Sequence, residues 1–265
     1  MPLRPEHAST VKIKGFQGLS MGLDWKKRMA SVIFTGGCNF RCPYCHNRDL
    51  VVNNDRLEDL SYEDNIKPEL LKYRHWSDSV VITGGEPTIH AGLPALVRDL
   101  KESGFNVKLD TNGSNPYALK YLTSKGLLDY IAMDIKDMPD DYDRYTRGAI
   151  PAKTILESIN HIISCGVDHE FRTTILPRFH EEKDIAAISR YLRAAGAMAY
   201  FLQNFRAVNT LDPALMDKAS FPSETFDILR LRYAYADGAG AGTGIDTERE
   251  GQDIKYAAVV RGCGG

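Results

Sequence analysis

The sequence has few cysteines, almost no net charge and no long apolar run. Its 265 residues carry 33 basic and 35 acidic side chains, which leaves a formal net charge of −2. We therefore expect no bulk electrostatic binding to nucleic acid or to anionic lipid. No apolar stretch approaches the length that spans a bilayer, so no membrane segment is predicted. Residues 1–20 show no signal-peptide pattern, and we expect a reducing, cytoplasmic environment.

Only five cysteines occur, and three of them lie close together. Cys38, Cys42 and Cys45 are spaced C-x3-C-x2-C, and the other two provide no second cluster motif. Thiolates at this spacing bind iron–sulfur clusters or zinc. Three thiolates are one short of the set for a four-iron cube, so one iron would stay open to a ligand that is not protein. Disulfides are disfavoured because nothing in the chain indicates secretion.

Zinc is the alternative metal. A structural zinc ion is closed by four ligands, and only His46 stands near enough in sequence to supply a fourth. His46 directly follows Cys45, which makes joint binding of one ion awkward. An iron–sulfur cluster therefore explains the three cysteines better than zinc does.

Apolar, β-branched strands alternate with amphipathic helices along most of the chain. Strands are predicted to begin at Ser31, Ser79, Asn106, Tyr130, Asp168 and Ala199, and helices are predicted over 62–76, 93–103, 116–124, 153–165, 181–194 and 223–235. This order predicts an α/β fold with a parallel sheet of right-handed βαβ units. The count is short of the eight strands that close a TIM barrel. A flavodoxin-like doubly wound sheet stays open as an alternative.

Several polar motifs follow these strands at their carboxyl ends. In T-G-G-E-P, Gly84 and Gly85 would let backbone approach a ligand, and Glu86 could accept from a cationic amine; a plain turn is the alternative. Asp110 and Asp134 end two neighbouring strands, where buried carboxylates need a cation.

An arginine also interrupts an apolar strand. Arg172 lies within F-R-T-T, where an unpaired guanidinium would be costly, so it should meet a carboxylate. That carboxylate could belong to a ligand or to the protein itself, as a structural ion pair.

The cysteine loop carries a family resemblance. C-x3-C-x2-C with Tyr44 before the last cysteine resembles the radical S-adenosylmethionine (SAM) enzymes, and C-P-Y-C-H-N-R-D is similar to the activating enzymes of glycyl-radical enzymes. The D-T-N-G, M-D-I-K and L-Q-N-F segments resemble the branch that activates anaerobic ribonucleoside-triphosphate reductase. The resemblance covers residues 14–206. It implies a partial (β/α)6 TIM-type barrel, in agreement with the strand count.

The resemblance also implies the cofactors and the residues that hold them. Cys38, Cys42 and Cys45 would bind a 4Fe–4S cluster whose fourth iron chelates SAM. The implied SAM-binding residues are Tyr44, Gly84, Gly85, Glu86, Asp110, Thr111, Asn112, Asp134, Lys136, Arg172 and Gln203. A monovalent cation, Na+ or K+, would bind Asp110, Thr111, Asp134 and the carbonyl of Ala132. Gln203 stands in place of a histidine that pyruvate formate-lyase activating enzymes carry near Phe205.

The implied activity is reductive cleavage of SAM and transfer of a radical to a glycine of a partner enzyme, with flavodoxin or ferredoxin as electron donor. Three alternatives remain: another glycyl-radical enzyme of the pyruvate formate-lyase type as partner, a small-molecule substrate, or a non-catalytic zinc-binding module. We expect a single domain over 1–265, with a loose arm at 1–10, a barrel core at 31–206 and an extension at 236–265.

Overall fold

The computed structural model describes residues 11–22, 24–25, 28–148, 150–215 and 220–236. The predicted arm at 1–10, the glycine-rich stretch 237–244, a possible strand at 256–260 and Cys263 lie outside the described residues. Within them, no helix is both long enough and apolar enough to cross a membrane.

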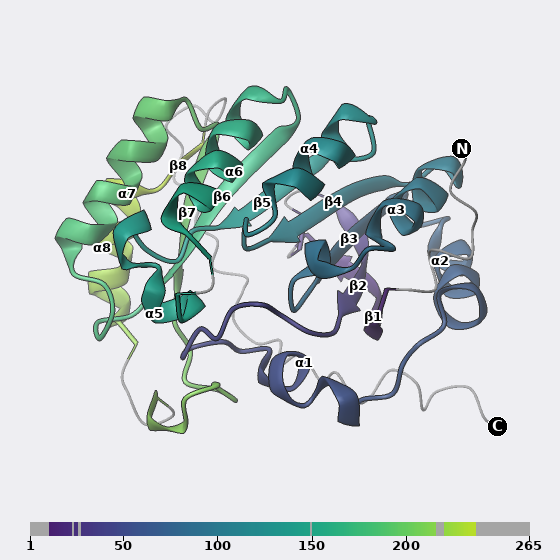
Figure 1. The fold of residues 1–265 in the computed structure, drawn as a ribbon, viewed down its shortest axis with the longest axis horizontal. Coiled ribbons are helices and arrows are strands. Elements are labelled where there is room, and N and C mark those ends of the chain that lie inside the picture. Colours follow the sequence, from purple (N-terminus) through teal and green to yellow (C-terminus); the bar gives the residue numbers. More distant parts are fainter. Residues whose placement is uncertain (1–10, 23, 26–27, 149, 216–219, 237–265) are drawn as a thin grey trace.

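One sheet forms the centre of the fold, and its described strands are ordered β1 to β8 without reversal (Figure 1). They are β1 (Ile13–Met21), β2 (Met29–Thr35), β3 (Ser79–Gly84), β4 (Asn106–Thr111), β5 (Tyr130–Asp134), β6 (Asp168–Ile175), β7 (Ala199–Asn204) and β8 (Tyr235–Ala236). The predicted strands β2–β7 are all parallel, and β1 and β8 add antiparallel edges. A doubly wound sheet reverses its strand order at a switch point. The unreversed order therefore confirms the partial barrel.

Helices connect the parallel strands, and Figure 1 shows α3, α4, α6 and α7 along one side of the sheet. The predicted helices correspond to α2 (Lys67–Tyr73), α3 (Leu93–Glu102), α4 (Pro116–Ser124), α6 (Ala152–Ser164), α7 (Glu182–Ala195) and α8 (Ser223–Tyr233). The sequence analysis missed α1 (Arg48–Val52) and α5 (Asp143–Thr146). Both are about one turn long and lack a side-chain cap, so no periodic pattern marks them.

The outer face of the sheet is apolar and packs under the helices. Val80, Ile82, Leu109, Ile131 and Phe171 are fully buried there in one large hydrophobic cluster. Successive side chains of a strand point to opposite faces. The residues between these therefore point into the barrel lumen.

The lumen has two unlike halves. At β2 and β3 it is apolar, and Val32, Phe34 and Val81 pack with Trp25 and Leu50 in a second hydrophobic cluster. At β4–β6 it is charged. Cross-strand pairs set Lys108 opposite Tyr130, Asp110 opposite Ala132, and Asp134 opposite Arg172. We call these regions the apolar half and the charged half.

Candidate active site

The cysteine loop leaves the carboxyl end of β2 and lies over the mouth of the barrel. Backbone hydrogen bonds fix it from both sides: Gly37 N donates to Leu50 O at 2.7 Å, and Arg41 N donates to Tyr145 O at 2.8 Å. Cys38 and Cys45 are half-buried and Cys42 is buried, and all three are free thiols. The predicted ligands thus share one loop that is anchored by α1 and α5.

The environment of the three thiols disfavours their ionisation to thiolates. Burial raises the pKa of Cys38 to about 12, and the nearby charge of Glu86 adds to this. Burial also raises the pKa of Cys42 to about 12, although Lys136 opposes it, and raises that of Cys45. Metal binding requires thiolates, and iron supplies the positive charge that buried thiolates lack. The donor set fits an iron–sulfur cluster.

His46, the residue considered as a zinc ligand, is engaged elsewhere. Its Nε2 lies 2.7 Å from the carbonyl oxygen of Arg206, and its ring stacks on Phe205 with centroids 5.7 Å apart. Because a carbonyl only accepts, Nε2 carries the proton in this contact. Burial lowers the pKa of His46, which favours the neutral ring. The imidazole joins the cysteine loop to the segment after β7.

The G-G-E motif follows β3 and crosses the start of the cysteine loop. Gly85 N donates to Thr35 O at 2.8 Å and Glu86 N donates to Gly37 O at 2.9 Å. A Cβ on Gly85 would lie 1.8 Å from Gly37 O, so only glycine fits. The close approach predicted for these glycines is thus made to the protein's own backbone. Their contact with SAM stays a prediction.

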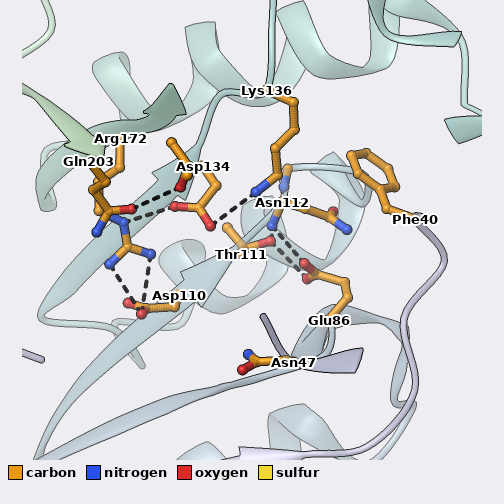
Figure 2. Close-up of polar contacts among 12 residues, drawn as sticks. Phe40, Asn47, Glu86, Asp110, Thr111, Asn112, Asp134, Lys136, Arg172 and Gln203 are labelled. Carbon is orange, nitrogen blue, oxygen red and sulfur yellow. Dashed lines mark hydrogen bonds and ion pairs between the residues drawn. The ribbon is translucent and has the colours of Figure 1, made fainter. Parts of the chain in front are cut away.

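Glu86 is fully buried beneath this crossing. Its two carboxylate oxygens accept hydrogen bonds from Thr88, Thr111 and Asn112. Figure 2 shows those from Thr111 and Asn112. Burial raises the pKa of Glu86, and these hydrogen bonds offset only part of that rise. The predicted bond from Glu86 to the amino group of SAM is not tested by this geometry.

Arg172 bridges the two strand-end carboxylates in the charged half (Figure 2). Its Nε donates to Asp134 Oδ1 at 2.8 Å, and its Nη1 and Nη2 lie 3.2 Å from Asp110 Oδ2. The protein itself therefore supplies carboxylate partners for Arg172. These are the carboxylates at which a monovalent cation was predicted, whereas Thr111, its third predicted side-chain ligand, donates to Glu86 at 2.8 Å.

Lys136 extends this network toward the cysteines. Its Nζ donates to Asp134 Oδ2 at 3.2 Å. Burial would raise the pKa of Asp134, but Arg172 and Lys136 outweigh it and hold that pKa well below its usual range. Burial would lower the pKa of Lys136, yet the charge of Asp134 raises it. Both groups are therefore charged at neutral pH.

Two predicted residues lie at the margins of this network. Gln203 faces the lumen beside Thr174, whose hydroxyl donates to Gln203 Oε1 at 3.4 Å. Tyr44 is buried behind the loop with its ring edge-on to Tyr145 and Phe179, 5.9 Å between centroids in each case. Among the described residues, the Tyr44 hydroxyl has no hydrogen-bond partner.

The sequence analysis missed residues that support the site. Asn47 Nδ2 donates to Gly84 O at 2.9 Å and ties the cysteine loop to the G-G-E motif. Lys108 and Glu170 lie 3.4 Å apart in the lumen, deeper than Arg172. The sequence does indicate that Lys108 and Glu170 face the lumen. In the strands N-V-K-L-D and D-H-E-F-R, charged residues alternate with apolar ones.

Comparison with known proteins identifies the family of this chain. Residues 32–191 match the family model of the radical SAM superfamily. A Methanocaldococcus jannaschii protein whose name assigns it to the glycyl-radical enzyme activating enzymes is 32% identical over 208 residues, which cover 76% of this chain and 82% of that protein. The pyruvate formate-lyase-activating enzyme of Streptococcus mutans is 29% identical over 172 residues, 61% of this chain and 65% of the relative.

Solved structures show the same fold. Streptococcus suis SuiB, bound to the precursor peptide SuiA, superposes with a TM-score of 0.56 at 13% identity, over 77% of this chain and 47% of SuiB. That identity supports the fold alone. The sequence matches go further: this chain belongs to the radical SAM superfamily and, within it, to the glycyl-radical enzyme activating enzymes.

Proposed function

We propose that this protein cleaves SAM reductively and installs a glycyl radical on an anaerobic ribonucleoside-triphosphate reductase. The observation that carries the proposal is the position of the three free cysteines at the mouth of the barrel, next to the charged half of the lumen. Lys136 lies close enough to Cys42 and Cys45 to oppose the burial effect on their thiol pKa values. Cluster ligands and a cationic side chain thus share one site.

The residues of this chain hold and orient the cofactors. Cys38, Cys42 and Cys45 would hold the cluster, and Lys136 would face the carboxylate of SAM. When bound, the cluster supplies the electron that breaks the S–C5′ bond of SAM, giving methionine and a 5′-deoxyadenosyl radical. We infer that flavodoxin or ferredoxin is the electron donor, in a reducing cytoplasm. A glycine Cα of the partner gives up one hydrogen atom, which yields 5′-deoxyadenosine and a glycyl radical.

The proposal includes a monovalent cation in the charged half. Na+ or K+ would have to share Asp110 and Asp134 with the guanidinium that already contacts both. Arg172 contacts Asp110 through Oδ2, whereas Asp110 Oδ1 accepts no hydrogen bond among the described residues and is the atom that such a cation would bind.

The reductase is favoured as partner by the strand L-Q-N-F, in which Gln203 replaces the histidine expected for the pyruvate formate-lyase branch. The sequence matches include proteins of that other branch, which makes pyruvate formate-lyase the second candidate partner.

Electron paramagnetic resonance tests the proposal. Reconstituted enzyme is mixed anaerobically with a reductant, SAM and the candidate reductase. We expect a doublet on the reductase that disappears when its C-terminal glycine is replaced by alanine. Cys42→Ala enzyme should give no doublet, because a cluster held by two thiolates is poorly retained, whereas Cys165→Ala should give the full signal. Cleavage of SAM without a radical on any glycyl-radical enzyme would instead indicate a small-molecule substrate.

A further inference from the structure

The carboxylate of Glu86 accepts four hydrogen bonds from the protein. Oε1 accepts from the backbone N of Thr88 at 3.1 Å, from its hydroxyl at 2.5 Å and from the Thr111 hydroxyl at 2.8 Å. Oε2 accepts from Asn112 N at 2.6 Å. Glu86 thus ties the loop after β3 to the carboxyl end of β4, as Figure 2 shows. Its direct effect is to fix the backbone of Asn112.

The side chain of Asn112 is oriented by its neighbours. Ser114 N can only donate, and it lies 2.9 Å from Asn112 Oδ1, so this atom is the amide oxygen. The NH2 group must then face the other way. There it donates to Asn39 Oδ1 at 3.0 Å and lies 3.8 Å from Cys38 Sγ.

Cys38 therefore has a distinct environment among the three predicted cluster ligands. Two N–H donors face its sulfur: the Asn112 amide and the backbone N of Phe40, at 3.3 Å. The carboxylate of Glu86 accepts from the backbone N of the same Asn112 at 2.6 Å, and its charge acts on the sulfur of Cys38. Cys42 and Cys45 instead lie near the ion pair of Lys136 and Asp134, whose charges act on them in opposite directions.

The hydrogen bonds to Cys38 and the charge of Glu86 have opposite effects on a bound cluster. A hydrogen bond to a ligating sulfur withdraws charge and stabilises the reduced cluster, which raises its reduction potential. A buried negative charge nearby disfavours the added electron and lowers that potential. Glu86 therefore has two effects at Cys38, since it holds the donor in place and also supplies the opposing charge.

We propose that Asn112 and Glu86 are positioning residues that set the reduction potential of the cluster through Cys38. Asn112 raises the potential through its N–H···S contact, and the charge of Glu86 lowers it. This inference rests on the proposed function because it presupposes the cluster at Cys38.

The test is anaerobic potentiometry of the full-length reconstituted enzyme, followed by electron paramagnetic resonance of the reduced cluster. Asn112→Ala should lower the midpoint potential, and Asn112→Asp should lower it further because the change also adds a negative charge. Glu86→Gln should raise the potential. Asn160→Ala, on an exposed turn of α6, is the matched control and should leave it unchanged.

The outcomes separate the inference from the function on which it rests. A merely structural role would alter iron content or SAM affinity without shifting the potential in opposite directions. Unchanged potentials, or shifts of the same sign in Asn112→Ala and Glu86→Gln, overturn the inference and leave the function intact. Loss of iron from all three variants overturns it as well. A wild-type protein that binds no iron and sulfide overturns both.

Discussion

The two halves of the barrel lumen are both filled by buried side chains, but one half is packed with apolar residues and the other with ion pairs. In the apolar half, Val32 and Val81 are fully buried against Trp25 and Leu50. In the charged half, Lys108 and Arg172 are almost as deeply buried, but they are surrounded by carboxylates. The apolar half carries the cysteine loop, whereas the charged half faces the space predicted for SAM. Apolar packing beneath the cysteine loop and buried ion pairs thus lie on different strands.

The charged half can be buried because its positive and negative side chains balance one another. The described cations and anions of this half are equal in number: Lys108, Lys136 and Arg172 against Asp110, Asp134 and Glu170. A buried ion pair adds little net stability, but removal of one partner leaves an uncompensated charge. The charged half is therefore the more fragile one, although Lys108 and Arg172 are almost as deeply buried as the apolar side chains. This contrast yields three predictions.

The largest effect is expected from Arg172→Gln. The change leaves Asp110 and Asp134 without their shared guanidinium, so we expect a loss of about 3–5 kcal/mol in the free energy of unfolding. Urea denaturation of the full-length cluster-free protein measures it. Arg232→Gln breaks an exposed pair with Glu182 and should leave the free energy of unfolding nearly unchanged. Equal losses in the two variants would contradict a special role for the buried network.

A smaller effect is expected in the apolar half. Val81→Ala removes two methyl groups from a fully buried position and should cost about 2 kcal/mol. Because no titratable group is lost, the cost should be the same at pH 4 and pH 7, measured by the same denaturation. A cost that changed with pH would indicate that the two halves are coupled.

Much of this architecture could be predicted from the sequence. The parallel strands follow from apolar runs separated by helical periodicity, and the three cysteines stand together in one short loop. Asp110, Asp134 and Arg172 were expected to need opposite charges, because each falls at or within an apolar strand. Their charges alone, however, did not show that they would satisfy one another. That depends on the register Asp134↔Arg172, which is a property of the assembled sheet.

The contacts that hold the cysteine loop in place could not be predicted from the sequence. The two bonds that hold the loop from α1 and α5 join backbone atoms, which leave no trace in residue type. The same holds for the crossing at Gly85, where the absence of a Cβ lets two chain segments approach closely. Asn112 lay inside a recognised motif, but its orientation depends on Ser114 and Asn39 together.

The smallest effect concerns the carboxylates of Asp134 and Glu86. Their contributions to the free energy of unfolding should change with pH in opposite directions. The pKa of Asp134 is lowered in the folded protein, so its contribution to stability is present above the unfolded value, near pH 4, and is lost as the pH falls. The pKa of Glu86 is raised, so its ionisation costs stability as the pH rises from about 4.

Relative to wild type, Asp134→Asn should therefore become less destabilising as the pH falls below 4. Glu86→Gln should gain relative stability as the pH rises above 4. Denaturation of the full-length cluster-free protein from pH 3 to pH 7 measures both trends. Parallel trends in the two variants would show that the buried hydrogen bonds of Glu86 hold its charge as firmly as Arg172 holds that of Asp134.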